Sequence, residues 1–346
     1  MIARRDSIAL RGLGATGLSV TELGFGTAPL GNLFRPLSDE TARESLAAAE
    51  KARFGYYDTA PFYGFGLSER RLGDALRGRK NIVLSSKVGR LLKPVPGPVD
   101  ERVPRHGYAT AMPFEPVFDY SYDAVMRSFE ASLQRLGLSR IDILYIHDIG
   151  RLTHGDQNVT HMAELTKGGG LKALEELRAA KAISAFGMGV NEAPACLEVM
   201  DHARLDVILL AGRYTLLEQS PLTDLFPRCA AAGTAIVIGG PYNSGILAVG
   251  TRTGAPLFYD YEPAPPDVIE KVHKIETICG RHGVPLAAAA LQFPLAHKLV
   301  ASVIPGLDSP RRVEQTLALY QHKIPVALWR DLRTENLIRA DAPVPT

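Results

Sequence analysis

Eight short apolar segments recur along the chain, and a helical pattern follows each of them. The predicted strands are 23–27, 54–60, 81–89, 141–147, 182–189, 205–211, 234–240 and 299–305. The predicted helices are 38–53, 68–76, 122–136, 170–180, 193–203, 222–232, 267–282 and 310–320. The strands are almost continuously apolar, as expected when both faces of a parallel sheet are buried. This alternation predicts an α/β fold, a (β/α)8 TIM barrel forming one domain over residues 1–346, with a doubly wound open sheet as the competing architecture.

A glycine motif near the N-terminus needs a separate interpretation. Gly12, Gly14 and Gly17 match the GxGxxG pattern of dinucleotide-binding folds. That motif must open a helix whose N-terminus binds the pyrophosphate, but here it continues into LSVTELGFGT, which is rich in β-branched residues. We therefore predict an N-terminal β-hairpin whose turn uses these glycines.

Two long connections follow predicted strands. Residues 90–120 are rich in proline, and residues 148–169 follow the fourth strand. Connections after strands lie on the C-terminal face of a barrel, where active sites form. We expect both to be long loops that form substrate walls rather than linkers.

Four polar residues come near strand ends and carry the candidate chemistry. Asp58 ends the second strand and Tyr63 follows five residues later, while Lys87 and His147 end the third and fourth strands. Each residue alone has an ordinary structural explanation, as a cap, a packing aromatic or a core histidine. Burying a lysine is costly unless it is paired, and Asp58 on the neighbouring strand is its natural partner. Together the four predict a catalytic site at one mouth of the barrel.

Composition excludes several classes of partner. Lysine and arginine number 39 against 37 acidic residues, so the net charge is +2, and nucleic acid or an anionic membrane is not an expected partner. Three separated cysteines give no disulfide framework, and no signal-peptide or membrane-spanning pattern is present, so we expect a cytoplasmic protein. His154 and His161 lack a coherent ligand spacing, and we expect no metal. The sequence assigns no oligomeric state.

Several motifs together resemble the aldo-keto reductase family. DTAPFYGFGLSE at 58–69 resembles its signature, and TGLSVTELGFGTAPLGN, SSKVG at 85–89 and YIHD at 145–148 accompany it in family order. GPYNSGIL at 240–247 resembles the phosphate-binding loop, and IPGLDSPRRVEQT at 304–316 resembles the adenosine-binding segment. These matches span nearly the whole chain and are highly specific.

The resemblance implies a role for each of the four polar residues. Tyr63 would be the general acid/base, exchanging a proton with substrate oxygen while hydride moves at carbon. Lys87, paired with Asp58, would lower the pKa of the phenol. His147 would orient the substrate oxygen. The implied cofactor-binding residues are Gly26, Thr27, Asp58, Asn191, Gly240, Pro241, Tyr242, Asn243, Ser244, Gly245, Gly306, Asp308, Arg312 and Gln315.

The chain departs from the family pattern at several cofactor positions. The usual Ser-Asn is Val190-Asn191, the usual glutamine aligns with Ala211, and the nicotinamide-stacking aromatic aligns with Gly239, where Tyr242 is a possible substitute. Where NADPH-dependent members place a lysine, this chain has Gly306 with Asp308 nearby. An anion disfavours a 2′-phosphate, so we expect NAD to be preferred, with NADP possible because Arg312 remains.

Within the family, the chain most resembles the aldose 1-dehydrogenase branch, in its IGGPYNSGIL stretch, its Arg213-Tyr214 segment and its proline-rich third loop. This resemblance implies oxidation of the anomeric hydroxyl of an aldose, of the L-fucose or D-threo type, to a lactone. Oxidation of the pyridoxal hemiacetal is the first alternative. A general NADPH-linked aldehyde reductase and a cofactor-sensing interaction protein that lacks catalysis, as in potassium-channel β-subunits, follow it.

Overall fold

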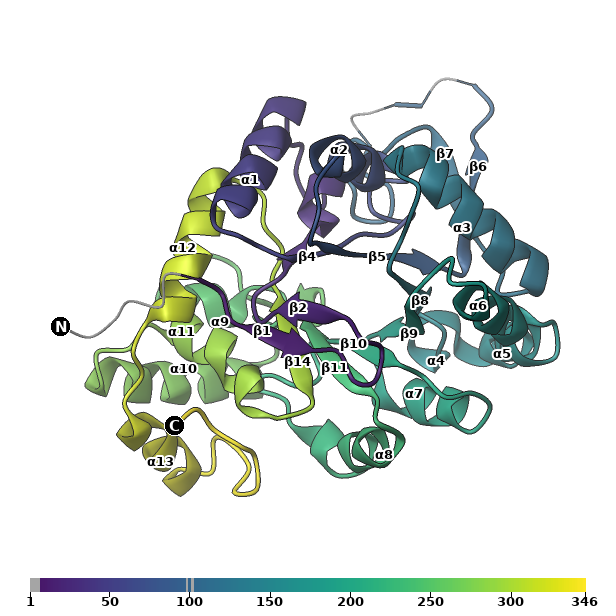
Figure 1. Cartoon of the computed structure of the whole chain (residues 1–346). Helices are drawn as coiled ribbons and strands as arrows, with labels where there is room; N and C mark the ends of the chain where they lie inside the picture. The colour runs from purple at the N-terminus through teal and green to yellow at the C-terminus, as the bar shows by residue number, and fades with distance from the viewer. Residues whose placement is uncertain (1–6, 98, 101–102) are drawn as a thin grey trace.

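The structure, a computed structural model, describes residues 7–97, 99–100 and 103–346 (Figure 1). Its central sheet has eight parallel strands, one at each predicted position. They are β3 (Phe25–Gly26), β4 (Tyr56–Asp58), β5 (Val83–Val88), β8 (Ile143–His147), β9 (Ala185–Val190), β10 (Val207–Ala211), β11 (Ala235–Gly239) and β14 (Val300–Ile304). The strands run in chain order across the sheet, from β3 through to β14.

The first and last strands of this sheet come together and close a barrel. Parallel bridges join Leu23 to Val303 and Gly26 to Gly306. The inward-facing positions form a separate apolar cluster that includes Tyr56, Tyr145 and Val237. The predicted (β/α)8 barrel is therefore confirmed, and the open doubly wound sheet is excluded.

Helices surround the barrel, and all eight predicted helices are present. They are α1 (Asp39–Lys51), α2 (Leu67–Leu76), α3 (Tyr122–Leu136), α6 (Gly170–Ala179), α7 (Ala193–Met200), α8 (Leu225–Ala232), α10 (Pro266–Arg281) and α12 (Pro310–Gln321). Three further helices, α9 (Ile246–Val249), α11 (Leu286–Gln292) and α13 (Val326–Thr334), extend the C-terminal half. Ser38, Ser121 and Ser309 accept hydrogen bonds from the first turns of α1, α3 and α12, and so satisfy backbone N–H groups there.

The N-terminal glycines form a hairpin turn, as predicted, and not a nucleotide-binding loop. β1 (Leu10–Gly12) pairs antiparallel with β2 (Ser19–Thr21). Gly14 and Gly17 both have positive φ, 55° and 77°, a conformation that is strained for a residue with a side chain. Leu13 and Val20 of this hairpin are buried in the inner apolar cluster, so the hairpin closes the N-terminal end of the barrel.

The two long connections contain more regular structure than expected. Residues 90–120 include an antiparallel hairpin of β6 (Arg90–Pro94) and β7 (Phe114–Phe118), and residues 148–169 include α4 (Arg151–His154) and α5 (Asn158–Thr166). The sequence analysis did not predict this hairpin, because its strands contain prolines at 94 and 116. Proline is tolerated here, since the two strands form an isolated ribbon whose outer edges need no backbone N–H donors. A further hairpin of β12 (Phe258–Tyr259) and β13 (Glu262–Pro263) precedes α10.

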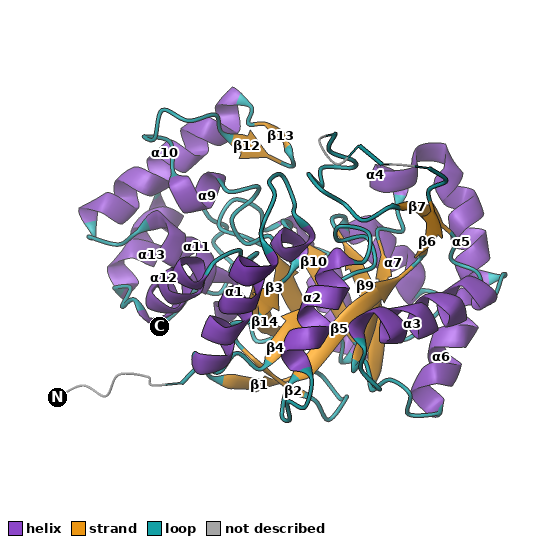
Figure 2. Ribbon diagram, turned by 90° about the horizontal axis from the view of Figure 1, so that it is seen from above, coloured by secondary structure: helices purple, strands orange, loops and turns teal. Residues whose placement is uncertain are grey.

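The long connections lie at the end of the barrel opposite the N-terminal hairpin. Figure 2 shows β1 and β2 at the bottom, and β12, β13 and α4 at the top. The top is the carboxyl end of the parallel strands, since Asp58 and His147 are the last residues of β4 and β8. The expected long loops on the C-terminal face are thus confirmed. None of the helices in the described ranges combines the length and hydropathy of a membrane span.

Candidate active site

Asp58 and Lys87 form a buried ion pair at the carboxyl end of the barrel. The Nζ atom of Lys87 lies 2.6 Å from Oδ2 of Asp58, and both side chains are almost completely buried. The same Nζ donates to the carbonyl oxygen of Thr59 at 2.8 Å, and Ser85 donates to Oδ1 of Asp58 at 2.6 Å. Burial raises the pKa of Asp58 and lowers the pKa of Lys87, and in each case the charge of the partner opposes the effect. The predicted pairing of the two residues is confirmed.

Tyr63 lies directly against this pair, in the loop after β4. Lys87 Nζ is 4.6 Å from the centroid of the Tyr63 ring. Burial, followed by the negative charge of Asp58, raises the pKa of Tyr63 well above its usual value of about 10. The expected net lowering of this pKa is therefore wrong. The physical reason is that burial, and after it the negative charge of Asp58, outweigh the effect of the nearby ammonium.

His147 completes the predicted group from the end of β8. Its ring centroid is 6.0 Å from that of Tyr63, and only 5% of the residue is exposed. Burial, together with the charges of Arg90 and Lys87, lowers the pKa of His147 well below its usual value. The imidazole is therefore neutral near pH 7 and has one N–H donor, which suits a hydrogen bond to an uncharged substrate oxygen.

A close backbone approach holds the Tyr63 loop in place. A Cβ atom at Gly31 would lie 2.5 Å from the carbonyl carbon of Tyr63, so no side chain fits there. The loop continues into α2, where Ser68 donates its backbone N–H to the Tyr63 carbonyl at 3.1 Å. The catalytic tyrosine is thus positioned by rigid elements on both sides.

Arg90 and Asp148 also lie at this mouth, and the sequence analysis did not single them out. Their side chains form an ion pair, and the Arg90 guanidinium carbon is 3.8 Å from the Phe62 ring centroid. Phe62, Phe65 and Tyr108 form an aromatic wall beside Tyr63. Asp148 was recognisable as the residue after His147, but the pairing with Arg90 joins two connections that are distant in the chain.

A polar chain inside the barrel also escaped the sequence analysis. Tyr56 and Tyr145 hydroxyl groups are 2.9 Å apart, and Tyr56 is 3.1 Å from Ser85, which binds Asp58. These residues occupy inward-facing strand positions, where polar groups are unusual in an apolar run. That contrast was the available signal.

The loop after β11 has the backbone of an anion-binding concavity. Gly240, Asn243, Ser244 and Gly245 all have positive φ, between 44° and 99°. Successive residues in such conformations turn backbone N–H groups toward one side, as phosphate-binding nests do. A Cβ at Gly245 would meet no atom within 4 Å, so its surroundings are open.

Two buried oxygen atoms of the same loop bear on which ligand it fits. Oδ1 of Asn243 and the hydroxyl of Tyr242 are buried and have no hydrogen-bond partner among the described residues. Asn243 is anchored through Nδ2, which donates to the Gly212 carbonyl at 3.0 Å, and Ser244 accepts from the backbone of Tyr261 at 2.9 Å. Pro241 is buried between these residues. The Tyr242 hydroxyl can donate to a phosphate oxygen, whereas Oδ1 of Asn243 can only accept a hydrogen bond. The positive-φ backbone and Tyr242 are therefore what fit this loop to a phosphate-containing cofactor.

The remaining predicted cofactor residues lie at the same end of the barrel but differ in accessibility. Gly26 donates to the Pro305 carbonyl, and the Thr27 side chain is completely buried, donating to the Asp58 carbonyl at 2.7 Å. Thr27 therefore supports the loop rather than exposing its hydroxyl. Arg312 and Gln315 are exposed on the first turns of α12.

Asp308 has a partner that the sequence did not reveal. Its carboxylate forms an ion pair with Arg35, and Arg312 Nε lies 3.9 Å away. Gly306 lies beside Pro29, whose Cγ would be 3.0 Å from an added Cβ. The guanidinium groups of Arg35 and Arg312 thus both lie near the carboxylate of Asp308.

A cavity of about 250 Å³ reaches Asp148, whose carboxylate lies 3.4 Å from Nε2 of His147. It is lined by Asp148, Leu152, Thr153, Val190, Asn191, Glu192, Arg213, Asp260 and Tyr261. Asp260 and Tyr261 are the tip of the β12–β13 hairpin, and Arg213 fastens this tip by an ion pair with Asp260 at 2.8 Å. Asn191 is therefore accessible from the mouth.

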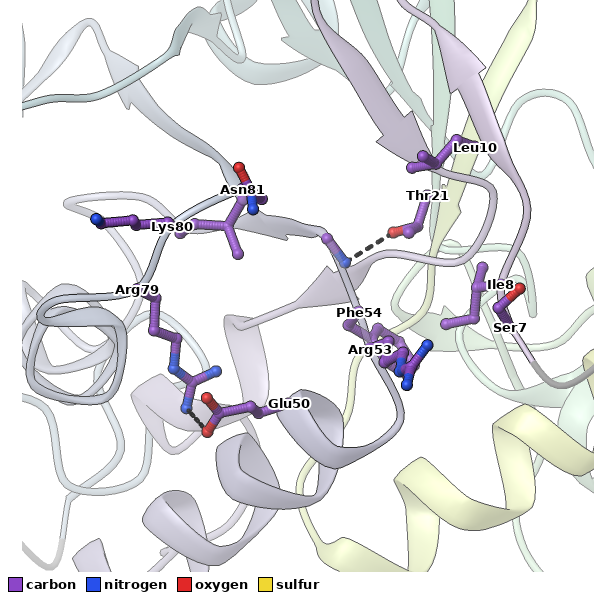
Figure 3. A pocket seen from close by; sticks show the side chains of 12 residues that line it. Ser7, Ile8, Leu10, Thr21, Glu50, Arg53, Phe54, Arg79, Lys80 and Asn81 are labelled. Carbon is purple, nitrogen blue, oxygen red and sulfur yellow. Dashed lines mark hydrogen bonds and ion pairs between the residues drawn. The ribbon is translucent and has the colours of Figure 1, made fainter.

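A larger cavity of about 440 Å³ lies at the other end of the barrel, around the N-terminal hairpin (Figure 3). Leu10 and Thr21 line one side, and Glu50, Arg53 and Arg79 line another. It contains none of the predicted site residues. Loops at this face of a barrel serve stability rather than catalysis.

His154 and His161 pack against each other and do not form part of a larger ligand group. Their ring centroids are 4.3 Å apart, and Phe118 and Tyr120 flank them. Burial and the neighbouring His161 lower the pKa of His154 to about 4. Within the described ranges, no three His, Cys, Asp or Glu side chains are grouped so that they could hold a metal ion.

Comparison with known proteins agrees with this geometry. Residues 22–333 match the model of the Aldo/keto reductase family. The chain is 46% identical over 340 residues to pyridoxal 4-dehydrogenase of Microbacterium luteolum, covering 95% of this chain and 97% of the relative. It is 41% identical to D-threo-aldose 1-dehydrogenase of a Pseudomonas species (94% and 96% covered) and 30% identical to L-galactose dehydrogenase of Arabidopsis thaliana (90% and 88% covered).

Solved structures show the same fold. The holo form of the aldo-keto reductase AKR11C1 from Bacillus halodurans superposes with a TM-score of 0.72 at 25% identity, covering 97% of this chain and 98% of that one. The family match covers most of the chain, and the barrel carries Asp58, Tyr63, Lys87 and His147 at one mouth. This chain is an oxidoreductase that belongs to the aldo/keto reductase family.

Proposed function

We propose that this protein oxidises a cyclic hemiacetal to a lactone, with NAD as the hydride acceptor and Tyr63 as the base. The observation that most supports this proposal is the position of Tyr63 against the buried Lys87–Asp58 pair. Neutral His147 lies at the same mouth of the barrel. Members of this family use nicotinamide cofactors, and the loop at 240–245 fits the phosphate groups of such a cofactor.

The reaction removes a proton and a hydride from one carbinol group. The phenolate of Tyr63 takes the proton from the hemiacetal hydroxyl, while the carbon–oxygen bond becomes a carbonyl. His147 donates its N–H to the same oxygen and fixes its orientation toward Tyr63. When bound, an oxidised nicotinamide would supply the hydride acceptor. Asn191, which is accessible from the mouth, would hold its carboxamide.

The Lys87–Asp58 ion pair beneath Tyr63 affects the ionisation of the Tyr63 hydroxyl. Lys87 remains protonated because Asp58 is 2.6 Å away, and its ammonium lies 4.6 Å from the tyrosine ring. Burial raises the pKa of Tyr63 and so favours the protonated phenol. Because a cation near the phenol favours phenolate, the Lys87 ammonium assists removal of the Tyr63 proton against the effect of burial.

Two classes of hemiacetal are candidates, and they differ in shape. The 46% identity to pyridoxal 4-dehydrogenase favours pyridoxal as the first substrate to test. An aldose of the L-fucose or D-threo type is the second candidate, supported by the 41% identity to D-threo-aldose 1-dehydrogenase and by the acids Asp148, Glu192 and Asp260 around the cavity.

NAD is the proposed cofactor, with NADP as a possible substitute. Gly306 offers no cation for a 2′-phosphate, and Asp308 adds a carboxylate beside it. Arg35 and Arg312 offset this carboxylate, so both cofactors bind in our proposal, and NAD more tightly. A general NADPH aldehyde reductase would instead favour NADP and reduce simple aldehydes.

We place the protein in the cytoplasm. Its three cysteines, Cys196, Cys229 and Cys279, are free and buried, and free thiols persist in a reducing compartment.

The test is turnover by the purified protein with NAD⁺ and a panel of pyridoxal, L-fucose, D-arabinose and L-galactose, followed by the absorbance of reduced cofactor. We expect lactone formation from one class, and a loss of at least about 10²-fold in kcat for Tyr63→Phe. Reduction of simple aldehydes with NADPH and no hemiacetal oxidation would establish the aldehyde reductase instead. Tight cofactor binding without any turnover would point to a cofactor-sensing protein.

A further inference from the structure

Asp148 has a strained backbone directly after His147. Its φ is 49°, a left-handed conformation that is unfavourable for a residue with a side chain. Its backbone N–H donates to the Gly189 carbonyl at 2.9 Å, which fixes this conformation between two barrel strands. The carboxylate is therefore held in one direction by the barrel itself.

Arg90 holds the Asp148 carboxylate in an ion pair. The Arg90 residue is 6% exposed, and its guanidinium carbon is 3.8 Å from the Phe62 ring centroid and 4.8 Å from that of Phe118. The Nε atom of Arg90 is buried and has no hydrogen-bond partner among the described residues. A buried ion pair contributes little to stability compared with apolar packing. Stability therefore does not explain why the Arg90–Asp148 pair lies beside His147.

Asp148 lines the cavity described above and is the lining residue that contacts His147. Its side chain is 22% exposed and lines the cavity of about 250 Å³ together with Asn191 and Tyr261. One carboxylate oxygen lies 3.4 Å from Nε2 of His147. An ionised carboxylate only accepts hydrogen bonds, so a ligand must present a donor to it. A hydroxyl group bound by Asp148 would therefore lie next to the oxygen that His147 orients.

We propose that Asp148, positioned by Arg90, accepts a hydrogen bond from a substrate hydroxyl that is adjacent to the reacting oxygen. The inference rests on the proposed function and names the hemiacetals that the site selects. The C2 hydroxyl of an aldose and the ring hydroxyl of pyridoxal both lie beside the reacting oxygen. Simple aldehydes and deoxy analogues lack this donor and leave the desolvated carboxylate without a partner, which is costly.

The test compares matched pairs of substrates that differ in one hydroxyl. L-Fucose is paired with 2-deoxy-L-fucose, and pyridoxal with 3-deoxypyridoxal. Binding is measured by calorimetry to the Tyr63→Phe protein saturated with NAD⁺, so that no turnover occurs, and kcat and KM are measured for the protein with Tyr63 intact. The variants are Asp148→Asn, Arg90→Met and Arg90→Lys. Asp156→Asn, a fully exposed acid in the same connection, controls for the loss of one charge.

We expect the hydroxylated member of at least one pair to bind at least tenfold more tightly than its deoxy partner. In Asp148→Asn and Arg90→Met this difference should fall below about threefold, through a higher KM for the hydroxylated substrate. Arg90→Lys should recover part of the difference because it keeps the positive charge, and Asp156→Asn should retain all of it.

Three outcomes would overturn the inference. If the protein binds and oxidises a hydroxylated substrate but the difference persists in Asp148→Asn, the proposed function stands and the role of Asp148 is wrong. Equal binding of the two members in both pairs, with Asp148 and Arg90 intact, has the same meaning. If neither substrate class binds or reacts, the proposed function fails and the inference fails with it.

Discussion

Lys87 Nζ lies 2.6 Å from Asp58 Oδ2 in a region where neither side chain is more than 3% exposed. The pair joins the ends of two neighbouring strands, β4 and β5, and Tyr63 rests against it. One contact therefore serves two purposes. It neutralises two buried charges, and it places a cation beneath the catalytic phenol.

Lys87→Met should abolish activity and destabilise the fold. Breaking a buried ion pair from one side costs about 3–5 kcal/mol, because the other charge stays buried without a partner. We expect the free energy of unfolding in urea to fall by this amount and kcat to fall by about 10²-fold or more.

The double variant Asp58→Asn/Lys87→Met separates the two effects. It contains no unpaired buried charge, so it should recover most of the lost stability while remaining inactive. If the double variant were as unstable as Lys87→Met alone, packing rather than charge would account for the loss.

The rate of hemiacetal oxidation should rise with pH. Burial raises the pKa of Tyr63, so the basic phenolate becomes more abundant as the pH increases toward that pKa. His147 has a lowered pKa and stays neutral, so no second limb is expected near pH 6.5. The measurement is kcat/KM for oxidation between pH 5 and pH 10. The Tyr63→Phe variant should give a low and flat profile, and a decline of the native rate with increasing pH would contradict the assignment of Tyr63 as the base.

Gly31→Ala should impair catalysis without unfolding the protein. The new methyl group would lie 2.5 Å from the Tyr63 carbonyl carbon and would push the catalytic loop aside. Overpacking of this kind costs about 1–3 kcal/mol, and a small displacement of a catalytic group can cost about 10²-fold in rate.

Gly280→Ala is the matched control, because an added Cβ there meets no atom within 4 Å. Gly280 lies within α10, so alanine should raise the free energy of unfolding by about 0.5–1 kcal/mol and leave kcat unchanged. Full activity of Gly31→Ala would show that the Tyr63 loop adapts.

Asp308→Asn should shift the cofactor preference toward NADP. The substitution removes the carboxylate that pairs with Arg35 and lies near Arg312, and it leaves two guanidinium groups available for a 2′-phosphate. We expect KM for NADP⁺ to fall about tenfold, with less than a threefold change for NAD⁺. Measuring both constants in Asp308→Asn and Asp156→Asn checks this, and an equal change for the two cofactors would show that Asp308 does not discriminate between them.

The sequence by itself determined the barrel and the ion pair. Eight apolar strand segments and eight helical patterns are local properties, and each one appears in the structure at its predicted position. The pairing of Asp58 with Lys87 also followed from the sequence, because a lysine in an apolar strand needs a partner on the neighbouring strand. The hairpin interpretation of Gly14 and Gly17 held for a similar reason, since turn chemistry is local.

Only the tertiary structure decided which long-range partners complete the site. Arg90 meets Asp148, and Arg35 meets Asp308, across separations that no periodic pattern encodes. The raised pKa of Tyr63 likewise depends on burial and on the charges that converge around it, and the short-range rule about lysine predicted the opposite direction. Strand patterns are set by each segment's own side chains, whereas charge balance in a mouth is set by loops that meet only after the barrel has closed.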